Sequence, residues 1–168
     1  MTLARLYISG TVRRYHASPD MAPLGQTNAD HQGRCVQLLL ALHPGPSLAL
    51  IDAVAHHDVG ELDACDLSGP FKRLHPDLAA GHAAIEAGYL RQTLGRDVFG
   101  RLHVGERWWL GFIDQLEAYC FMQSHAPAVR CGHGWSETRA RILDQAGEVP
   151  GLQDRVAGLI WDLEARVW

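Results

Sequence analysis

Apolar residues recur at helical spacing over most of this chain, and the clearest example lies between residues 28 and 42. One helix face would carry Cys35, Leu38, Leu39 and Leu42, at positions i, i+3, i+4 and i+7. Either Thr27 or Asn28 can cap the first turn. The prolines at 44 and 46 end the pattern, because proline cannot continue a helix. This segment is therefore predicted to be an amphipathic helix.

Further helices follow the first, and no stretch alternates apolar and polar residues in the way a strand does. Their expected ranges are 47–60, 76–95, 106–125, 136–147 and 151–168. Pro76 suits a first helical turn, Gly95 suits a helix end, and Ser136 can cap the segment 136–147. Residues 60–73 are expected to form an ordered loop. The pattern predicts an all-α helical bundle.

Length and composition are those of one globular domain. The 168 residues include 47% hydrophobic and 20% charged residues, which is enough for one core and excludes overall disorder. The formal net charge of −4 disfavours duplex nucleic acid as a partner, because general nucleic-acid binders are basic. We expect a single domain over residues 1–168.

Neither a secretory signal nor a membrane span is expected. Arg13 and Arg14 follow the short apolar run of the first ten residues, whereas a signal peptide carries its positive charges before that run. The longest stretch without formal charge, residues 35–51, is interrupted by Pro-Gly-Pro. The four cysteines form no C-x-x-C pair, which favours reduced thiols in a cytoplasm. These cysteines are Cys35, Cys65, Cys120 and Cys131.

Three polar signals interrupt the apolar helix faces. His31 stands four residues before Cys35 and therefore shares its apolar face. His57 and Asp58 come at the end of the second predicted helix. Asp114 has apolar residues at i−4, i+4 and i+7, so its carboxylate would be at least half buried and would need a partner or a metal. Two imidazoles with two carboxylates suit a divalent transition ion that keeps positions open for water and substrate.

The order His … His-Asp … Asp resembles the signature of the HD-domain metal-dependent phosphohydrolases. Residues 26–32, QTNADHQ, are similar to the family's Q-T-x-A-E-H-S. Residues 57–72, HDVGELDACDLSGPFK, resemble the H-D-x-x-E-x-x-x-G-D-x-P-x-P-x-K run of the 5′-deoxynucleotidase branch and its small phage relatives. Arg14-Tyr15-His16 resembles that branch's Arg-Trp-His, and the run from Asp114 resembles its D-x-L-E-A helix.

The resemblance covers residues 10–122, with three departures. Cys65 replaces the family glycine, Ser68 replaces the first proline of the long run, and Tyr15 replaces the tryptophan that lies near the sugar in the family. The last 46 residues contribute no motif.

The resemblance implies a single HD-type helical domain that hydrolyses deoxynucleotides in the cytoplasm. One Zn, Co or Mn ion is implied, with further divalent ions accompanying the substrate phosphates as an option. The implied ligands of that ion are His31, His57, Asp58 and Asp114. Glu61 is expected to orient the water bound to the ion or to shuttle its proton, and Asp66 to protonate the leaving oxygen.

Substrate binding is expected to involve both cationic and aromatic side chains. Two aspartate ligands cancel the charge of a 2+ ion, so the substrate phosphate needs further cations, for which Arg14 and Lys72 are the candidates. Tyr15 and His16 are the candidates for the sugar and nucleoside pocket. His56 is expected to support the site or to pack. The tryptophans are expected to be core or dimer contacts.

Two substrates and one different class of function stay open. A monophosphate would give deoxynucleoside and phosphate, whereas a triphosphate would be cleaved as in the small phage dATP triphosphohydrolases. A non-enzymatic nucleotide sensor with the same fold is the other class. Cations near the pocket, such as Arg13, Arg34 or Arg73, would favour more phosphates. The apolar last helix, which ends in Trp168, favours a homo-oligomer, a dimer or higher. The resemblance implies the same, because members of that family are commonly dimers.

Overall fold

A computed structural model describes residues 2–130, 132 and 134–166, and the chain is all-α, as predicted. No β-strand forms within the described ranges. Single 3-10 turns lie at Ala22–Leu24 and Pro127–Val129. The helices are α1 (Leu3–Ser9), α2 (Asn28–Leu42), α3 (Leu48–His56), α4 (Glu61–Ala64), α5 (Gly69–Leu74), α6 (Pro76–Leu94), α7 (Val104–His125), α8 (Trp135–Gly147) and α9 (Leu152–Ala165).

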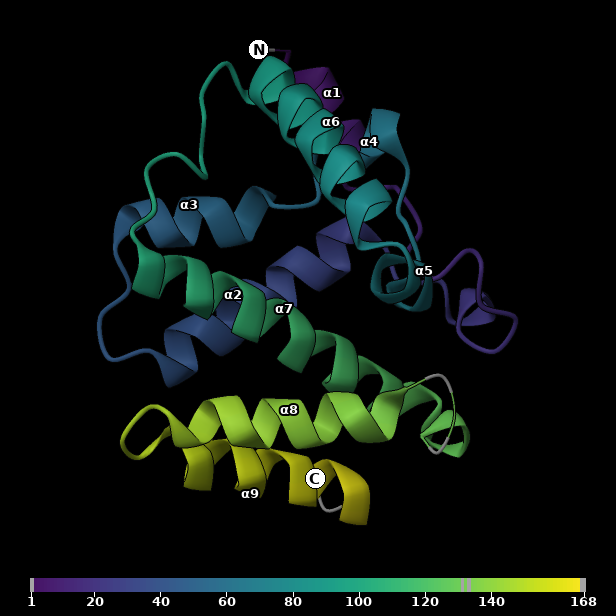
Figure 1. The fold of residues 1–168 in the computed structure, drawn as a ribbon, viewed down its shortest axis with the longest axis vertical. Helices are drawn as coiled ribbons and strands as arrows, with labels where there is room; N and C mark the ends of the chain where they lie inside the picture. The colour runs from purple at the N-terminus through teal and green to yellow at the C-terminus, as the bar shows by residue number, and fades with distance from the viewer. Residues whose placement is uncertain (1, 131, 133, 167–168) are drawn as a thin grey trace.

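Helix α7 crosses the middle of the molecule and organises the other elements (Figure 1). It packs against α2 and α3 on one side and against the α8–α9 hairpin on the other. Helices α1, α4 and α6 form a separate group at the opposite end from α9, and α5 packs against α6. Two long helices, α2 and α7, therefore lie side by side at the centre.

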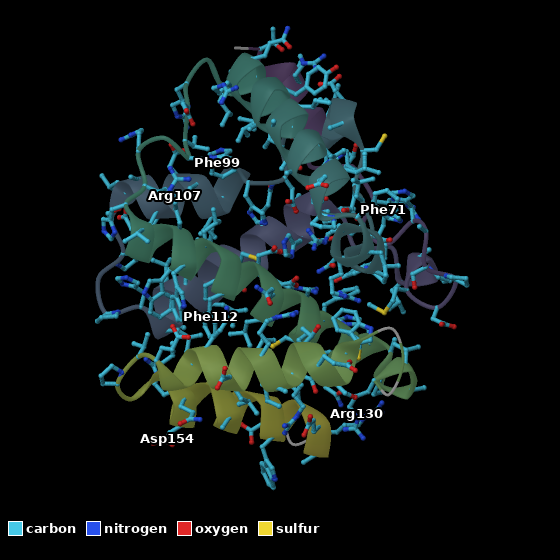
Figure 2. All side chains as sticks on the ribbon, viewed as in Figure 1. Phe71, Phe99, Arg107, Phe112, Arg130 and Asp154 are labelled. Atoms are coloured by element: carbon cyan, nitrogen blue, oxygen red, sulfur yellow. The ribbon has the colours of Figure 1, made fainter. Side chains whose placement is uncertain are left out.

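The core follows the helical periodicity that the sequence predicts. Helix α7 buries one apolar face, and Phe112, labelled in Figure 2, is almost completely excluded from solvent. Helix α2 contributes Cys35 and Leu39 to the same core, and α9 contributes Val156 and Ile160. Burying each such side chain stabilises the fold by about 1.5–3 kcal/mol.

Helix ends confirm several of the boundary signals. Thr27, one of the two candidates, caps α2: its hydroxyl accepts from the Asp30 amide, and the Asp30 carboxylate accepts from the Thr27 amide at 3.1 Å. This reciprocal pair is a capping box. Pro76 opens α6, and Gly95 ends it with a left-handed φ of +69°.

Other boundaries differ from the sequence predictions. The predicted loop over 60–73 contains the short helices α4 and α5, whose lengths of 4 and 6 residues are too short to show a periodic pattern. The N-cap of α8 is Gly134 rather than Ser136, which lies inside the first turn. Helix α3 ends at His56, so the candidate ligands that follow lie in a turn.

Some earlier expectations concern residues that the structure does not describe. Cys131 and Trp168 lie outside the described residues. Cys35, Cys65 and Cys120 are free thiols. Within the described ranges, no helix combines the length and the apolar character needed to cross a lipid bilayer.

Candidate metal centre and adjoining cavity

The structure brings the four predicted ligands into one cluster. Helix α2 supplies His31, the turn after α3 supplies His57 and Asp58, and α7 supplies Asp114. His31 Nε2 lies 3.1 Å from both His57 Nε2 and Asp114 Oδ1. His57 Nε2 lies 3.5 Å from Asp58 Oδ1 and 3.8 Å from Asp114 Oδ1.

The 3.1 Å and 3.5 Å separations match the spacing of ligands around a small divalent ion, whereas the 3.8 Å separation is longer. Nitrogen and oxygen ligands lie about 2.0–2.2 Å from Zn, so two ligands of one ion are separated by roughly 3.0–3.5 Å. The His31, His57 and Asp58 side chains are buried, whereas that of Asp114 is 42% exposed. The donor set is thus closed on the protein side and open on one side.

Outer hydrogen bonds fix the orientation of both histidines. His31 Nδ1 is hydrogen-bonded to the buried carboxylate of Glu117, which also accepts from Gln26 Nε2 at 2.8 Å. His57 Nδ1 donates to the Val54 carbonyl at 2.8 Å. Holding Nδ1 in this way turns each Nε2 lone pair toward the shared centre and makes it a better ligand.

Sequence reasoning missed Glu117, although the chain carries a signal for it. An acidic residue one turn after Asp114, on an otherwise apolar helix face, needs a buried partner. Cys35, one turn after His31, also lies close, with its Sγ 3.6 Å from His31 Nε2. Burial raises the pKa of the Cys35 thiol far above its ordinary value.

The Arg14 side chain lies beside two of the candidate ligands, Asp58 and Asp114. Backbone bonds hold residues 12–14 beside the start of α2, including Arg14 N to the Gln26 carbonyl at 2.9 Å. The guanidinium donates to Asp58, and its second terminal nitrogen is 3.8 Å from Asp114 Oδ1. Arg14 Nε has no hydrogen-bond partner among the described residues. The predicted phosphate cation thus balances the ligand carboxylates here.

The electrostatics of the cluster favour bound positive charge. Burial alone would lower the pKa of His57, but the charges of Asp58 and Asp114 outweigh it and raise that pKa to about 9. Burial opposes ionisation of Asp114, but its hydrogen bonds to both imidazoles bring its pKa well below the usual range. Such a site attracts a cation, whether a proton, a guanidinium or a metal ion.

Glu61 lies beneath the cluster rather than in the open space. It is buried, and its carboxyl accepts from Asn28 Nδ2 at 2.9 Å. Burial, and then the charge of Asp58, raise its pKa to about 8. Glu86 of α6 brings a third carboxylate within 4.8 Å of those of Asp58 and Glu61. Gly60 permits this approach, because a Cβ there would lie 2.3 Å from the Glu86 carbonyl oxygen.

A cavity of about 670 Å³ adjoins the open side of the cluster. It reaches the predicted substrate residues Arg14, Tyr15, His16 and Lys72, together with Asp66 and Asp114. Asp66 and Lys72 face each other, with Nζ 3.7 Å from Oδ1. Glu61 is not among the described residues that line this space.

Tyr15 forms an aromatic wall of the cavity. Its ring stacks on Phe121 with centroids 6.0 Å apart and an interplanar angle of 10°. Its backbone is left-handed, with φ of +57°, which is uncommon for a residue with a Cβ. The buried hydroxyl has no hydrogen-bond partner among the described residues.

Further residues line the cavity. Trp135, expected as a core or dimer contact, packs against the core and also lines this space. Arg73, one of the cations that would favour more phosphates, lines it as well, as does Arg141, which the sequence did not single out. Arg34 instead lies over the Phe121 ring, 5.4 Å from its centroid. His56 is hydrogen-bonded to the Asp52 carbonyl at 2.8 Å and does not join the cluster.

Comparison of the chain with models of protein families, with curated proteins and with solved structures finds no match in any of the three.

Proposed function

We propose that this chain is an HD-type, metal-dependent phosphohydrolase that acts on deoxynucleoside 5′-phosphates. The observation that carries the proposal is a cluster of two imidazoles and two carboxylates whose one exposed member, Asp114, opens onto a cavity lined by cations. A monophosphate substrate would yield deoxynucleoside and phosphate. The donor set suits Zn, Co or Mn as the resident ion.

A divalent ion held by His31, His57, Asp58 and Asp114 would supply a water molecule of lowered pKa and positive charge for a phosphate oxygen. Glu117 and the Val54 carbonyl keep both imidazoles oriented for that role. Lys72, on the cavity wall, attracts the phosphate charge. Arg14 joins it when substrate competes for its guanidinium with Asp58.

Two carboxyl groups are available to move protons. Asp66 lies on the cavity wall beside Lys72, where it can protonate the leaving oxygen. Glu61 lies beside Asp58 and is held by Asn28, so it can take a proton on the protein side of the cluster. Their separate positions, one exposed to the cavity and one buried, support separate roles.

The sugar preference rests on Tyr15. Its ring is fixed against Phe121 beside the candidate phosphate cations. A 2′-hydroxyl packed against an aromatic face loses hydration without gaining a partner, which costs binding energy. Deoxynucleotides are therefore the proposed substrates, and ribonucleotides are expected to be poor ones.

A non-enzymatic nucleotide sensor is the second candidate function, because the same cavity could bind without catalysis. The presence of Glu61 and Asp66 beside the donor cluster favours the enzyme, since a sensor needs no proton-transfer groups. A homo-oligomer, a dimer or higher, stays part of the proposal. The exposed Trp161 on α9 is one apolar residue available for such a contact.

The test is metal-dependent turnover of matched nucleotides. Protein stripped with a chelator should not release nucleoside from a deoxynucleotide, and addition of Zn, Co or Mn should restore release. The ribonucleotide with the same base serves as the matched substrate control. Full turnover by the stripped protein would overturn the metal role. Nucleotide binding without turnover under any metal would favour the sensor.

A further inference from the structure

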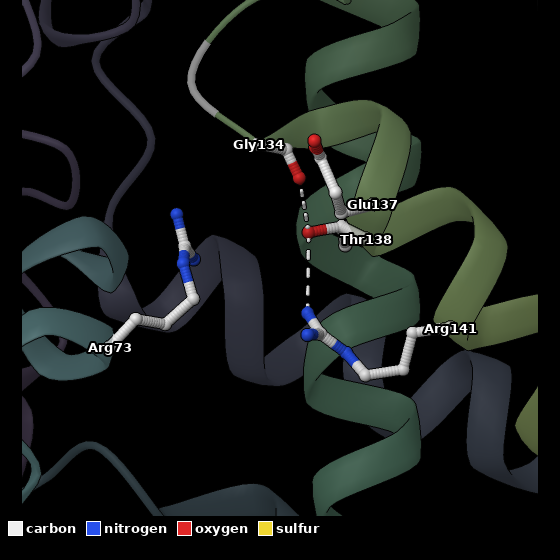
Figure 3. A pocket seen from close by; sticks show the side chains of 5 residues that line it. All are labelled: Arg73, Gly134, Glu137, Thr138 and Arg141. Atoms are coloured by element: carbon white, nitrogen blue, oxygen red, sulfur yellow. Dashed lines mark hydrogen bonds between the residues drawn. The ribbon is translucent and has the colours of Figure 1, made fainter.

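A second hollow adjoins the candidate active-site cavity at the start of α8. Its volume is about 320 Å³, and the described residues that line it are Arg73, Gly134, Glu137, Thr138 and Arg141. Arg73, Thr138 and Arg141 also line the larger cavity, so the two spaces meet at these residues. Figure 3 shows Arg73 extending from α5 and Arg141 from α8 toward the space between the two helices.

Arg73 and Arg141 differ from the arginines of this protein that are paired with carboxylates. Arg96 and Arg139, for example, are paired with carboxylates at 2.5 Å and 2.7 Å. Arg141 donates only to uncharged oxygens, those of Gln115 at 2.7 Å and Thr138 at 3.3 Å. Arg73 has no ion pair with any residue that the structure describes. Two positive charges thus face one hollow, and Glu137, an exposed residue, is the only acidic residue among the described residues that line it.

The backbone at the hollow brings Gly134 close to the end of the Arg73 side chain. Gly134 has a left-handed φ of +79°, which favours glycine, and a Cβ at this position would lie 2.9 Å from the terminal nitrogen of Arg73. The Arg73 guanidinium therefore lies against the start of α8. On the opposite side, the Thr138 hydroxyl donates to the Gly134 carbonyl at 2.9 Å and accepts from Arg141, which fixes the position of that guanidinium.

We propose that Arg73 and Arg141 form a subsite for the distal phosphates of a nucleoside polyphosphate. Planar guanidinium groups bind phosphate oxygens in pairs. The larger cavity runs from Asp114, at the metal cluster, to this arginine pair. In this proposal, a substrate whose first phosphate lies at Asp114 extends its further phosphates along the same cavity toward the two arginines. This inference rests on the proposed function and selects a triphosphate over a monophosphate.

The first experiment compares two substrates of the same deoxynucleoside. Wild-type protein should show a higher kcat/KM for the triphosphate than for the monophosphate. Arg73→Gln and Arg141→Gln should each lower the triphosphate value by about tenfold to a hundredfold, the range for a charge-assisted hydrogen bond. The monophosphate value should change by less than about threefold, because a single phosphate does not reach the pair. Arg91→Gln, which removes an exposed arginine outside both cavities, is the charge-matched control.

The second experiment separates the subsite from catalysis. Titration calorimetry with inorganic tripolyphosphate, in buffer without divalent ions, should show binding that both cavity variants weaken by at least about tenfold and Arg91→Gln does not. Arginine-dependent binding in a protein that hydrolyses no nucleotide would leave the subsite standing and remove the proposed function. Monophosphate and triphosphate hydrolysis equally insensitive to both variants, with unchanged tripolyphosphate binding, would overturn the subsite alone.

Discussion

The candidate metal cluster and the cavity beside it are built in opposite ways. His31 and Asp114 of the cluster lie on the two long central helices. Behind them, the buried Glu117 carboxylate is hydrogen-bonded to both His31 and Gln26. The wall that carries Lys72 comes from a helix of 6 residues, and its cations are exposed. Buried hydrogen bonds thus fix the cluster, whereas the cavity wall presents charged side chains at the surface.

Under the proposed function, the cluster would carry out the reaction and the cavity wall would recognise the substrate. Groups that must share one ion need positions accurate to a fraction of an ångström. Long helices provide this for His31 and Asp114, and the hydrogen bond to the Val54 carbonyl provides it for His57 in the turn after α3. Groups that attract a charged substrate act over longer distances and tolerate mobility. Changes in the cluster should therefore abolish activity, whereas changes in the wall should alter substrate preference.

Removal of a cluster ligand should have the largest effect. Asp114→Ala is expected to lose the ion and to lower turnover by more than about a thousandfold, because three ligands leave an incomplete shell. Metal content by mass spectrometry and turnover should fall together. Asp144→Ala, at an exposed position on α8, is the matched control. A variant at 114 that keeps its full metal content would contradict the ligand set.

Glu61→Ala should lower turnover less than Asp114→Ala does, and it should leave the metal content unchanged. This residue lies beside Asp58 without belonging to the four ligands, so the metal should stay while turnover falls by roughly 10²- to 10⁴-fold, the range for a positioned acid–base group. The same two measurements distinguish the roles. If metal content falls with activity, Glu61 is itself a ligand and the assignment is wrong.

Glu117→Gln should produce the smallest change of the three. The amide oxygen can still accept from His31 Nδ1, but the negative charge that strengthens the imidazole is lost. Loss of such an outer partner typically weakens metal binding by about 10- to 100-fold. Competition with a chromogenic chelator measures this shift, with Glu148→Gln as an exposed control. Unchanged affinity would show that Glu117 is a packing group only.

The long helices could be predicted because their ends carry local signals. Thr27 at the start of α2 and Gly95 at the end of α6 act through their own backbone neighbourhoods, so the sequence nearby is sufficient. Helices α4 and α5 could not be predicted in this way. Each has at most two turns, so contacts with α6 rather than periodicity decide whether they form.

The candidate site divides along similar lines. His31 and Asp114 were conspicuous because polar groups on apolar faces need an explanation. Arg141 and Trp135 were not, because exposed and half-buried residues of α8 look alike until the path of the chain places that helix beside α5. Their role depends on contacts between residues more than 60 positions apart, which no local pattern encodes.

Cys65 combines a φ of +63° with a ψ of 159° at the position where the resembling family has glycine. Residues with a side chain rarely adopt this conformation, and it costs about 1–3 kcal/mol. The turn joins two helices that are each too short to persist alone, so little free energy opposes its local opening. Amide hydrogens of residues 61–74 should thus exchange with solvent through local openings that leave α2 and α7 intact. This side of the cavity can therefore open locally while His31 and Asp114 keep their positions.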